Sequence, residues 1–213
     1  MKRPRVLLAD DHKIVTEGLR NLLEPEFELV GVVEDGRAMV AVTKGLNPDV
    51  VVVDISMPLL NGIEAVRQLK KDGIRAKVIF LTMHPDVTYA IRAFEAGASG
   101  FVLKHSASSE LLTAIREVLK GRTYVTPMIA EELMVAYKGA SQRRQRAAPR
   151  LTPRQREVLQ LVAEGHSAKE IASVLSVSAR TVEFHKYRIM EELNIRSVAE
   201  LIQYAIKEGI ASV

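Results

Sequence analysis

The chain has 213 residues, of which 47% are hydrophobic, enough for one large domain or two small ones with a buried core. It has no Cys, which excludes disulfides, thiolate metal sites and a Cys nucleophile, and no apolar run reaches the roughly 18 residues of a membrane-spanning helix. From these absences we expect a cytoplasmic protein. The net charge is +4, and residues 138–150 carry five Lys or Arg and no acid, which is typical of a linker or arm near a polyanion.

Five units of strand followed by helix are predicted in residues 5–120. The strands are short apolar runs at Arg5–Ala9, Phe27–Val33, Val50–Val53, Lys77–Leu81 and Gly100–Leu103. Helical spacing follows each run, at residues 14–23, Met39–Leu46, Gly62–Lys71, Val87–Ala96 and Ser109–Lys120. This alternation predicts an α/β domain with a five-stranded, parallel, doubly wound sheet covered by helices on both faces.

The third strand ends on an acid that nothing apolar explains. Val50–Val53 suits a strand buried on both faces, Asp54 follows it, and Pro58 prevents the strand from continuing. A lone carboxylate there loses hydration without an obvious partner. Because ligands bind at the carboxyl ends of strands in open parallel sheets, Asp54 is a candidate for chemistry. A helix N-cap or a turn aspartate is the alternative interpretation.

Polar residues also end other predicted strands: Asp10 and Asp11 after the first, Thr82 after the fourth and Lys104 after the fifth. Right-handed crossovers bring all these ends to one edge of the sheet. Three carboxylates repel one another and need a cation, and hard oxygen ligands with open positions suit Mg²⁺. Lys104 would hold a phosphoryl oxygen and Thr82 would donate a hydrogen bond. The cluster therefore predicts phosphoryl transfer to a carboxylate, giving an acyl phosphate.

Over residues 5–121, this set of residues, with Pro58 and Gly62, resembles the receiver domain of two-component response regulators. The resemblance implies a flavodoxin-like fold in which Asp54 is the phospho-acceptor. Thr82 and Lys104 would contact the phosphoryl group.

The same resemblance implies metal ligands and a switch residue. Asp11 would bind Mg²⁺ directly and Asp10 through water, while Asp54 and the main-chain carbonyl of Ser56 would complete the set. Phe101 stands where the family's switch aromatic falls. Because Phe has no hydroxyl, its switching would depend on packing alone.

The two residues that follow Thr82, Met83 and His84, lie near the predicted phosphorylation site. Met83 stands where many receivers carry a smaller residue, so it would narrow the approach to Asp54. His84 lies nearby, and we interpret it as a loop histidine, a catalytic role being the alternative.

Residues 123–150 connect the predicted receiver, residues 1–122, to a segment of different character. Apolar spacing predicts a helix at Thr126–Tyr137. Gly139–Arg150 is polar, basic and without periodicity, which indicates a mobile linker. Its basic residues would touch DNA phosphates or form a solvated run of charge, and the sequence leaves both interpretations open.

Residues 151–213 lose the strand signal and form a predicted all-α domain of four helices. The helices span residues 153–164, 168–175, 179–193 and 198–208, and capping boxes begin at Thr152, Ser167 and Ser197. The short turn Ser176–Ser178 joins the second helix to the third. Such a tight pair is typical of a helix-turn-helix motif.

One face of the third helix suits the major groove of DNA. Arg180, Glu183, Phe184 and Tyr187 fall at i, i+3, i+4 and i+7, opposite a face that we assign to the core. Arg can reach guanine, Glu can accept from cytosine, and Phe can touch a thymine methyl. Lys169, Lys186 and Arg188 are placed for phosphates. The alternative is that the two aromatics pack on a partner subunit or on the N-terminal domain.

Several motifs in this segment resemble the LuxR-type helix-turn-helix: Leu151–Leu159, Glu164-Gly165, Lys169–Ala172, Ser178, Thr181-Val182 and His185. Thr181, inside these motifs, joins the predicted DNA contacts. Together the two domains resemble NarL/FixJ-type response regulators over nearly the whole chain.

The resemblance implies a transcription regulator rather than a metabolic enzyme. A histidine kinase would transfer phosphoryl to Asp54, the recognition helix would be released from the receiver, and homodimers would form on double-stranded DNA. The fourth helix offers an apolar dimer face, with packing inside its own domain as the alternative; that face comprises Leu201, Ile202, Ala205 and Ile206.

Two other functions compete with this prediction. A Mg²⁺-dependent phosphohydrolase would also use an aspartyl-phosphate, but it usually carries a second acid two residues after the nucleophile, where this chain has Ser56. An interaction module that works without phosphorylation would not need the acidic cluster.

Overall fold

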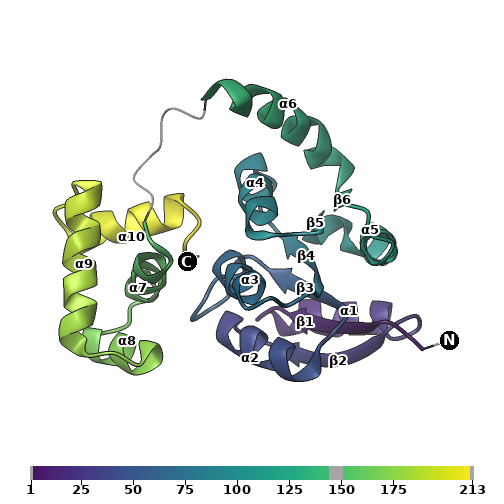
Figure 1. Ribbon diagram of the computed structural model, residues 1–213, viewed down its shortest axis with the longest axis horizontal. Helices are drawn as coiled ribbons and strands as arrows, with labels where there is room; N and C mark the ends of the chain where they lie inside the picture. The colour runs from purple at the N-terminus through teal and green to yellow at the C-terminus, as the bar shows by residue number, and fades with distance from the viewer. Residues whose placement is uncertain (1, 144–150, 212–213) are drawn as a thin grey trace.

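The computed structural model describes residues 2–143 and 151–211, which form an N-terminal α/β domain and a C-terminal helical domain (Figure 1). The sheet contains β1 (Arg5–Ala9), β2 (Glu28–Val33), β3 (Val50–Asp54), β4 (Lys77–Thr82), β5 (Gly100–Leu103) and β6 (Tyr124–Val125). All neighbouring strands are parallel, in the order β2-β1-β3-β4-β5-β6. The first five strands confirm the predicted flavodoxin-like, doubly wound sheet.

Helices cover both faces of this sheet. One face carries α1 (Lys13–Leu23) and α5 (Ala107–Leu119), and the other carries α2 (Gly36–Leu46), α3 (Gly62–Lys71) and α4 (Val87–Ala96). Side chains of β3 alternate between the two cores: Val50 and Val52 pack with α1 and α5, while Val51 and Val53 pack with the other three helices. All of β3 is therefore buried, and Asp54 stands at its exit.

In the α/β domain, a sixth strand and the starts of two helices differ from the prediction by more than one residue. The sixth strand, β6, was not predicted, because two residues beside β5 are too short for a periodic signal. Helix α2 begins at Gly36 rather than Met39, because the Asp35 side chain accepts from the N–H of Ala38 at 2.8 Å and caps an earlier turn. Helix α5 begins at Ala107, after the 3₁₀ turn η1 (Lys104–Ser106).

Helix α6 (Pro127–Arg143) runs beyond its predicted end at Tyr137. It packs against α4, with Ile129 and Leu133 in the core on that side of the sheet. Residues 139–143 are helical, so the predicted mobile linker is wrong for these five positions. The rest of that prediction, residues 144–150, lies outside the described residues.

The C-terminal domain consists of α7 (Pro153–Ala163), α8 (Ala168–Leu175), α9 (Ala179–Leu193) and α10 (Val198–Lys207), which confirms the four predicted helices. Capping boxes form at Thr152 and Ser167. At Ser197 only half of the box forms, because the Glu200 carboxylate accepts from the N–H of Arg196 at 3.3 Å instead. In the part of the chain that the structure describes, every helix is too short or too polar to cross a bilayer.

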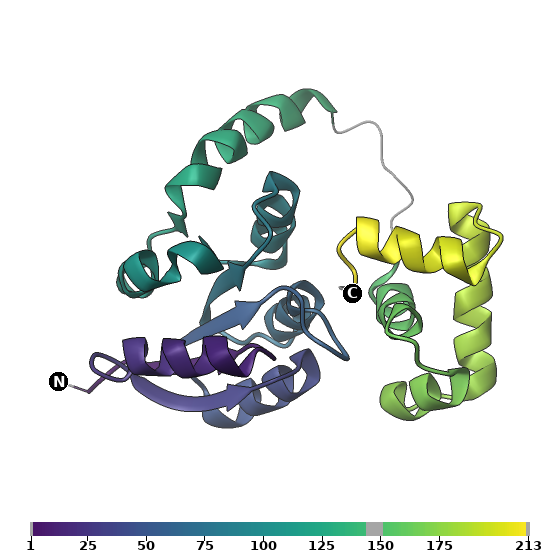
Figure 2. The same cartoon turned by 180° about the vertical axis from the view of Figure 1, so that it is seen from behind.

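Helix α7 and the end of α10 face the N-terminal domain, beside α3, whereas α9 lies on the far side (Figures 1 and 2). Ion pairs and hydrogen bonds join α7 to α3 directly, among them Arg156 to Glu64 and Gln68 to Glu157. This arrangement places the segment after Asp54 next to the C-terminal domain.

Candidate functional site

The strand ends bring Asp10, Asp54 and Lys104 into direct contact. Asp10 follows β1, Asp54 ends β3, and Lys104 follows β5. The Nζ atom of Lys104 donates to Oδ2 of Asp54 at 2.6 Å and lies 2.7 Å from Oδ2 of Asp10. The two carboxylates are 4% and 1% exposed, so one ammonium group balances two acids that water barely reaches.

Burial sets the protonation behaviour of this pair. It raises the pKa of the Asp54 carboxyl above its ordinary value, although Lys104 opposes the change. Burial alone would lower the pKa of Lys104, but attraction to Asp54 and contacts with both carboxylates leave that pKa raised. A further cation beside Asp54 would make its ionised form less costly.

Asp11 and His12 lie on the solvent side of the cluster, with side chains 35% and 59% exposed. The Nδ1 atom of His12 lies 3.0 Å from a carboxylate oxygen of Asp10 and 3.0 Å from one of Asp11. One ligand atom from each of these three residues and from Asp54 falls within 4.8 Å of the others. Sequence reasoning missed His12, although its place directly after two acids was a usable signal.

The loops after β3 and β4 form the other wall of this cleft, whose volume is about 330 Å³. The Ser56 hydroxyl lies 3.1 Å from Nε2 of His84, and the His84 ring stacks on Tyr89 with ring centroids 4.5 Å apart. Met83 also lines the cleft and is 67% exposed. His84 thus contacts the loop that follows Asp54, a contact that the sequence alone did not indicate.

Thr82 and Phe101 lie in the core beneath the cleft. Both are fully buried, and the Thr82 hydroxyl accepts from the N–H of His84 at 3.1 Å. Among the described residues, no hydrogen bond joins Thr82 to Asp54 or Lys104, and its predicted contact with a phosphoryl group stays a prediction. Phe101 points into the core shared with α4, which is the inward position of the predicted switch.

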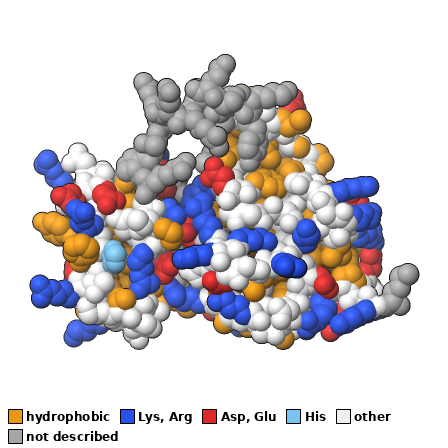
Figure 3. All heavy atoms as spheres, in the orientation of Figure 1, with side chains coloured by type: hydrophobic (Ala, Val, Ile, Leu, Met, Phe, Trp, Pro, Cys, Tyr) orange, Lys and Arg blue, Asp and Glu red, His pale blue; other side chains and the backbone are white. Residues whose placement is uncertain are grey.

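The side chains predicted to read DNA lie on the exposed face of α9. Phe184 and Tyr187 are 60% and 76% exposed. Of the other predicted contacts, Lys169, Arg180, Glu183 and Arg188 are exposed, and Thr181 and Lys186 are half-buried. Figure 3 shows hydrophobic side chains beside Lys and Arg side chains along the outer edge of this domain. In this arrangement the two aromatics do not pack on the N-terminal domain.

Four of these side chains already have partners in α9 or at its N-cap. Glu183 and Lys186 form an ion pair at 2.7 Å, and Arg188 pairs with Glu191 at 3.1 Å. The Thr181 hydroxyl lies 2.8 Å from that of Ser178, the N-cap of the helix. DNA contacts by these residues would require them to exchange partners.

Helix α9 does not lie against the N-terminal domain in this arrangement, so the alternative in which its aromatics pack there is not observed, and its predicted release on phosphorylation stays a prediction. Within the described residues, no hydrogen bond or ion pair joins α9 to that domain, and the contacts are made by α7 and the end of α10. The reason is that α7 carries polar residues on the side away from its own core, where Gln160 and Glu157 meet the loop after β3 and helix α3. The face of α9 that is predicted to read DNA is therefore exposed in this arrangement of the two domains.

Half of the apolar face predicted on α10 belongs to the core of its own domain. Leu201 and Ala205 are fully buried among α7 and α9 residues. Ile202 is half-buried, Ile206 is 38% exposed, and Val198, which was not predicted, is 45% exposed. The apolar surface left for a partner is therefore narrower than predicted and extends to the start of the helix.

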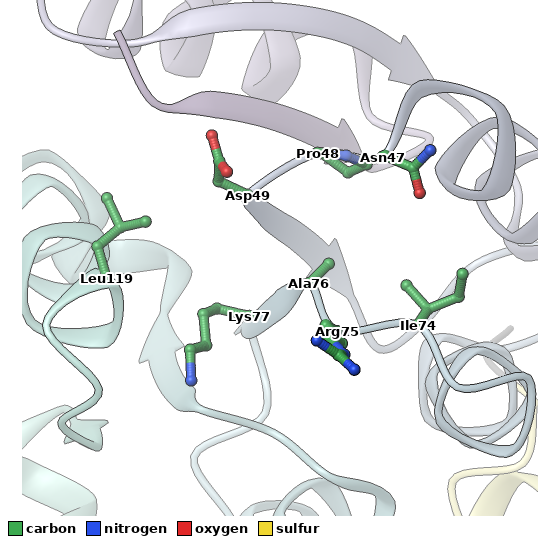
Figure 4. Close-up of a pocket in the computed structure, with 8 residues that line it drawn as sticks. All are labelled: Asn47, Pro48, Asp49, Ile74, Arg75, Ala76, Lys77 and Leu119. Atoms are coloured by element: carbon green, nitrogen blue, oxygen red, sulfur yellow. The ribbon is translucent and has the colours of Figure 1, made fainter. Parts of the chain in front are cut away.

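A second cleft, of about 350 Å³, lies at the opposite edge of the sheet. Figure 4 shows its lining, with Asp49 and Lys77 at the starts of neighbouring strands and their charged ends pointing apart. Asp49 accepts from the N–H of Arg5 at 2.7 Å, so it has a structural partner. This cleft is about as large as the first, but among the residues that the structure describes it brings together no cluster of acids.

Comparison with known families agrees with this division of the chain. Residues 6–116 match the family model of the response regulator receiver domain. Residues 149–205 match that of the bacterial regulatory proteins of the luxR family. The chain therefore belongs to the NarL/FixJ-type two-component response regulators, which combine a receiver with a LuxR-type DNA-binding domain, and it is a transcription regulator.

Relatives match along nearly the whole chain. The transcriptional regulatory protein DegU of Brevibacillus brevis is 32% identical over 96% of this chain and 94% of its own length. The transcriptional regulatory protein MctR of Rhizobium johnstonii is 34% identical over 98% of this chain and 95% of its own. Among solved structures, RcsB from Salmonella enterica serovar Typhimurium, bound to promoter P1flhDC in the presence of the phosphomimetic BeF₃⁻, matches with a TM-score of 0.61 and 28% identity, covering 99% and 100% of the two chains.

Proposed function

We propose that Asp54 accepts a phosphoryl group from a partner histidine kinase, and that this modification controls homodimerisation and binding to double-stranded DNA. The observation that carries the proposal is the contact of one buried ammonium, Lys104 Nζ, with both Asp10 and Asp54. A carboxylate that is costly to ionise and held beside a cation is typical of a reactive site.

In the transfer, a carboxylate oxygen of Asp54 forms a bond to phosphorus while the phosphorus–nitrogen bond of the kinase phosphohistidine breaks. The released imidazole takes a proton from water. Lys104 keeps its charge and can move from Asp54 to a phosphoryl oxygen, because an acyl phosphate carries its negative charge further from the strand. Thr82 would rotate from its bond with His84 to meet another phosphoryl oxygen.

The acidic cluster fits Mg²⁺. Its oxygen donors come from Asp10, Asp11 and Asp54, with the Ser56 carbonyl as a further candidate, and these ligand types suit a small hard cation. Asp11 and Asp54 would hold the ion directly, and Asp10 would hold it through water. When bound, Mg²⁺ neutralises charge on the phosphoryl oxygens.

Support for the DNA-binding half of the proposal comes from the exposed face of α9 and from relatives. Arg180, Phe184 and Tyr187 would contact bases, and Lys169, Lys186 and Arg188 would contact phosphates. Thr181 and Glu183 complete the proposed DNA contacts. One structure of RcsB shows two dimers bound to two parallel DNAs. We place this regulator in the cytoplasm, where bacterial DNA lies.

The test measures phosphorylation and DNA affinity together, on a random-sequence selection pool at stated salt. Wild type, Asp54→Asn and Lys104→Ala are compared with and without acetyl phosphate and Mg²⁺, and Asp72→Asn at an exposed position serves as the control. We expect wild type and the control to take up phosphate and to bind DNA more tightly, while Asp54→Asn does neither. DNA binding that is equally tight with and without the donor would overturn the phosphorylation switch.

A further inference from the structure

The last residue of β5, Leu103, directly precedes Lys104, and a side chain rather than a strand pairs its main-chain N–H. Leu103 is 1% exposed, so an unpaired N–H at this position would be costly. The neighbouring strand β6 ends at Val125 and leads into α6 (Figure 1). Beyond that end, the hydroxyl of Thr126 accepts from the Leu103 N–H at 3.2 Å. Thr126 therefore completes the edge of β5 at the residue before Lys104.

The hydroxyl of Thr126 takes this place because its main-chain groups have other partners. Its N–H donates to the Phe101 carbonyl at 2.9 Å, which continues the pairing of β5 with β6 by one residue. Its carbonyl accepts from the N–H groups of Ile129 and Ala130 in the first turn of α6. The side-chain oxygen is then the acceptor that remains for the buried Leu103 N–H.

The same hydroxyl is held from its other side by Glu110. It donates to Oε2 of Glu110 at 2.7 Å, and the Tyr124 hydroxyl donates to that oxygen at 3.2 Å. Burial, and the charge of Glu110, raise the pKa of Tyr124, so its hydroxyl remains a donor at neutral pH. Thr126 is 2% exposed and uses its hydroxyl both as donor and as acceptor, which fixes the orientation of the group.

Lys104 lies between the two elements that Thr126 joins. Leu103, on its N-terminal side, is bonded to Thr126, and Glu110, on its C-terminal side, stands in the first turn of α5. The turn between them is η1, in which the Lys104 carbonyl accepts from the N–H of Ala107. The Lys104 side chain is 6% exposed, and its Nζ atom lies 2.6 and 2.7 Å from two carboxylate oxygens. A shift of this turn would change both distances.

We propose that Thr126, held by Glu110, is a positioning residue that fixes Lys104 for phosphoryl transfer to Asp54. The proposal rests on the proposed function of Asp54 and adds two residues that act from outside the cleft. They act through the main chain, because one hydroxyl ties the end of β5 to the start of α5. Without that hydroxyl, Lys104 would keep its charge but lose its fixed distance to the reacting oxygen, and phosphoryl transfer depends strongly on positioning.

Phosphorylation of the full-length protein by acetyl phosphate with Mg²⁺ tests the role of the hydroxyl. Thr126→Val keeps the shape of the side chain and removes the hydroxyl. We expect a maximal rate lower on the order of tenfold, since misplacement by about 1 Å can cost about 100-fold, with the half-saturating donor concentration nearly unchanged. Thr126→Ser, which keeps the hydroxyl, should restore most of the rate. Thr113→Val at an exposed position of α5 is the matched control and should behave like wild type.

A double-mutant cycle with Lys104→Ala separates positioning of Lys104 from a general weakening of the fold. If Thr126 acts through Lys104, Thr126→Val should leave the slow residual rate of Lys104→Ala nearly unchanged. Glu110→Ala, at a half-buried position, should lower the rate less than Thr126→Val does and with the same dependence on Lys104, and it decides the question if Thr126→Val does not fold. Equal losses of rate with and without Lys104 would overturn the proposal.

A second readout follows Lys104 without any phosphoryl donor. An ammonium group that is buried and bonded to carboxylates exchanges its protons slowly with water and gives an NMR signal of its own. This signal is assigned to Lys104 by its loss in Lys104→Ala. We expect it to be broadened or lost in Thr126→Val and to be kept in Thr126→Ser and Thr113→Val.

The outcomes separate the two proposals. Wild type that takes up no phosphate overturns the proposed function, and the ammonium signal in Thr126→Val still decides whether this hydroxyl positions Lys104. Wild type that takes up phosphate, with Thr126→Val and Glu110→Ala matching it in rate, keeps the proposed function and overturns the positioning role.

Discussion

The Nε atom of Arg156 in α7 lies 2.6 Å from Oε1 of Glu64 in α3, which makes an ion pair between the two domains. Glu64 is 3% exposed, and Arg67 of the receiver lies 3.8 Å from the same oxygen, so the DNA-binding domain supplies the nearer of two counter-ions for this buried carboxylate. Detachment of the domains would expose this carboxylate to water, and a variant that removes only one partner would leave a buried charge.

We predict that Glu64→Gln destabilises the attached arrangement, since breaking a buried pair typically costs about 3–5 kcal/mol. In a double-mutant cycle with Arg156→Met, the two changes should be strongly non-additive, and thermal unfolding of the full chain measures this. Glu26→Gln, which breaks an exposed pair with Arg116 inside the receiver, is the control and should change little. Additive effects of Glu64→Gln and Arg156→Met would contradict the prediction.

Asp54→Asn should raise the melting temperature at neutral pH without Mg²⁺. Burial raises the pKa of Asp54, so its ionised form is less favourable in the folded chain than in the unfolded one. The stabilisation that the protonated carboxyl gives is fully present below the unfolded pKa and is lost as pH rises through the folded pKa. The gain from Asn should therefore shrink as pH falls toward the ordinary value of an aspartate, and a gain of equal size at all pH values would count against it.

Mg²⁺ should stabilise wild type by about 2.7 kcal/mol at one hundred times its dissociation constant. For a chain of this size, that corresponds to a shift in melting temperature of roughly 2–4 °C for each kcal/mol. Asp11→Asn should lose most of the shift, because it removes a ligand at the solvent side of the cluster. Asp72→Asn, which breaks only a surface contact with Lys44, should respond to Mg²⁺ like wild type.

Substitutions on α8 and α9 should distinguish side chains that read bases from side chains that bind phosphates. Loss of a base contact in Arg180→Ala or Tyr187→Ala should cost about 1–3 kcal/mol on the preferred sequence and relax selectivity there. Lys169→Ala should weaken binding to all sequences alike and reduce the salt slope by about 1. Lys207→Ala on exposed α10 is the control for loss of positive charge. Equal losses on every sequence for Tyr187→Ala would assign it to phosphate contacts or packing.

The strand ends were predictable because the parallel sheet fixes where they meet. Asp10, Asp54 and Lys104 are far apart in sequence, yet each directly follows a run of apolar residues, and that pattern was enough to place them together. His12 was missed because an exposed residue in the first turn after a strand has no periodic signal of its own.

The interface between domains was not predictable in the same way. Gln160 and Met57 are 103 positions apart, and nothing in a helical pattern says which domain a polar face will meet. A polar side chain on an amphipathic helix is usually solvated, so burial of Gln160 appears only once the second domain is in place.

Within the described residues, five of the seven hydrogen bonds between the two domains involve a main-chain group. The main-chain partners include the Met57 carbonyl, the Asn61 N–H and the Ile210 carbonyl. Such groups are present whatever side chain a position bears, with proline alone lacking the N–H. On the receiver side, Met57, Leu59 and Asn61 contribute main-chain groups, so the side chains at these positions are interchangeable for those three bonds, whereas Gln160 in α7 is not. A receiver that shares only the backbone of the loop after β3 would keep those three bonds and would lose the four that need the side chains of Arg37, Asn61, Gln68 and Arg92.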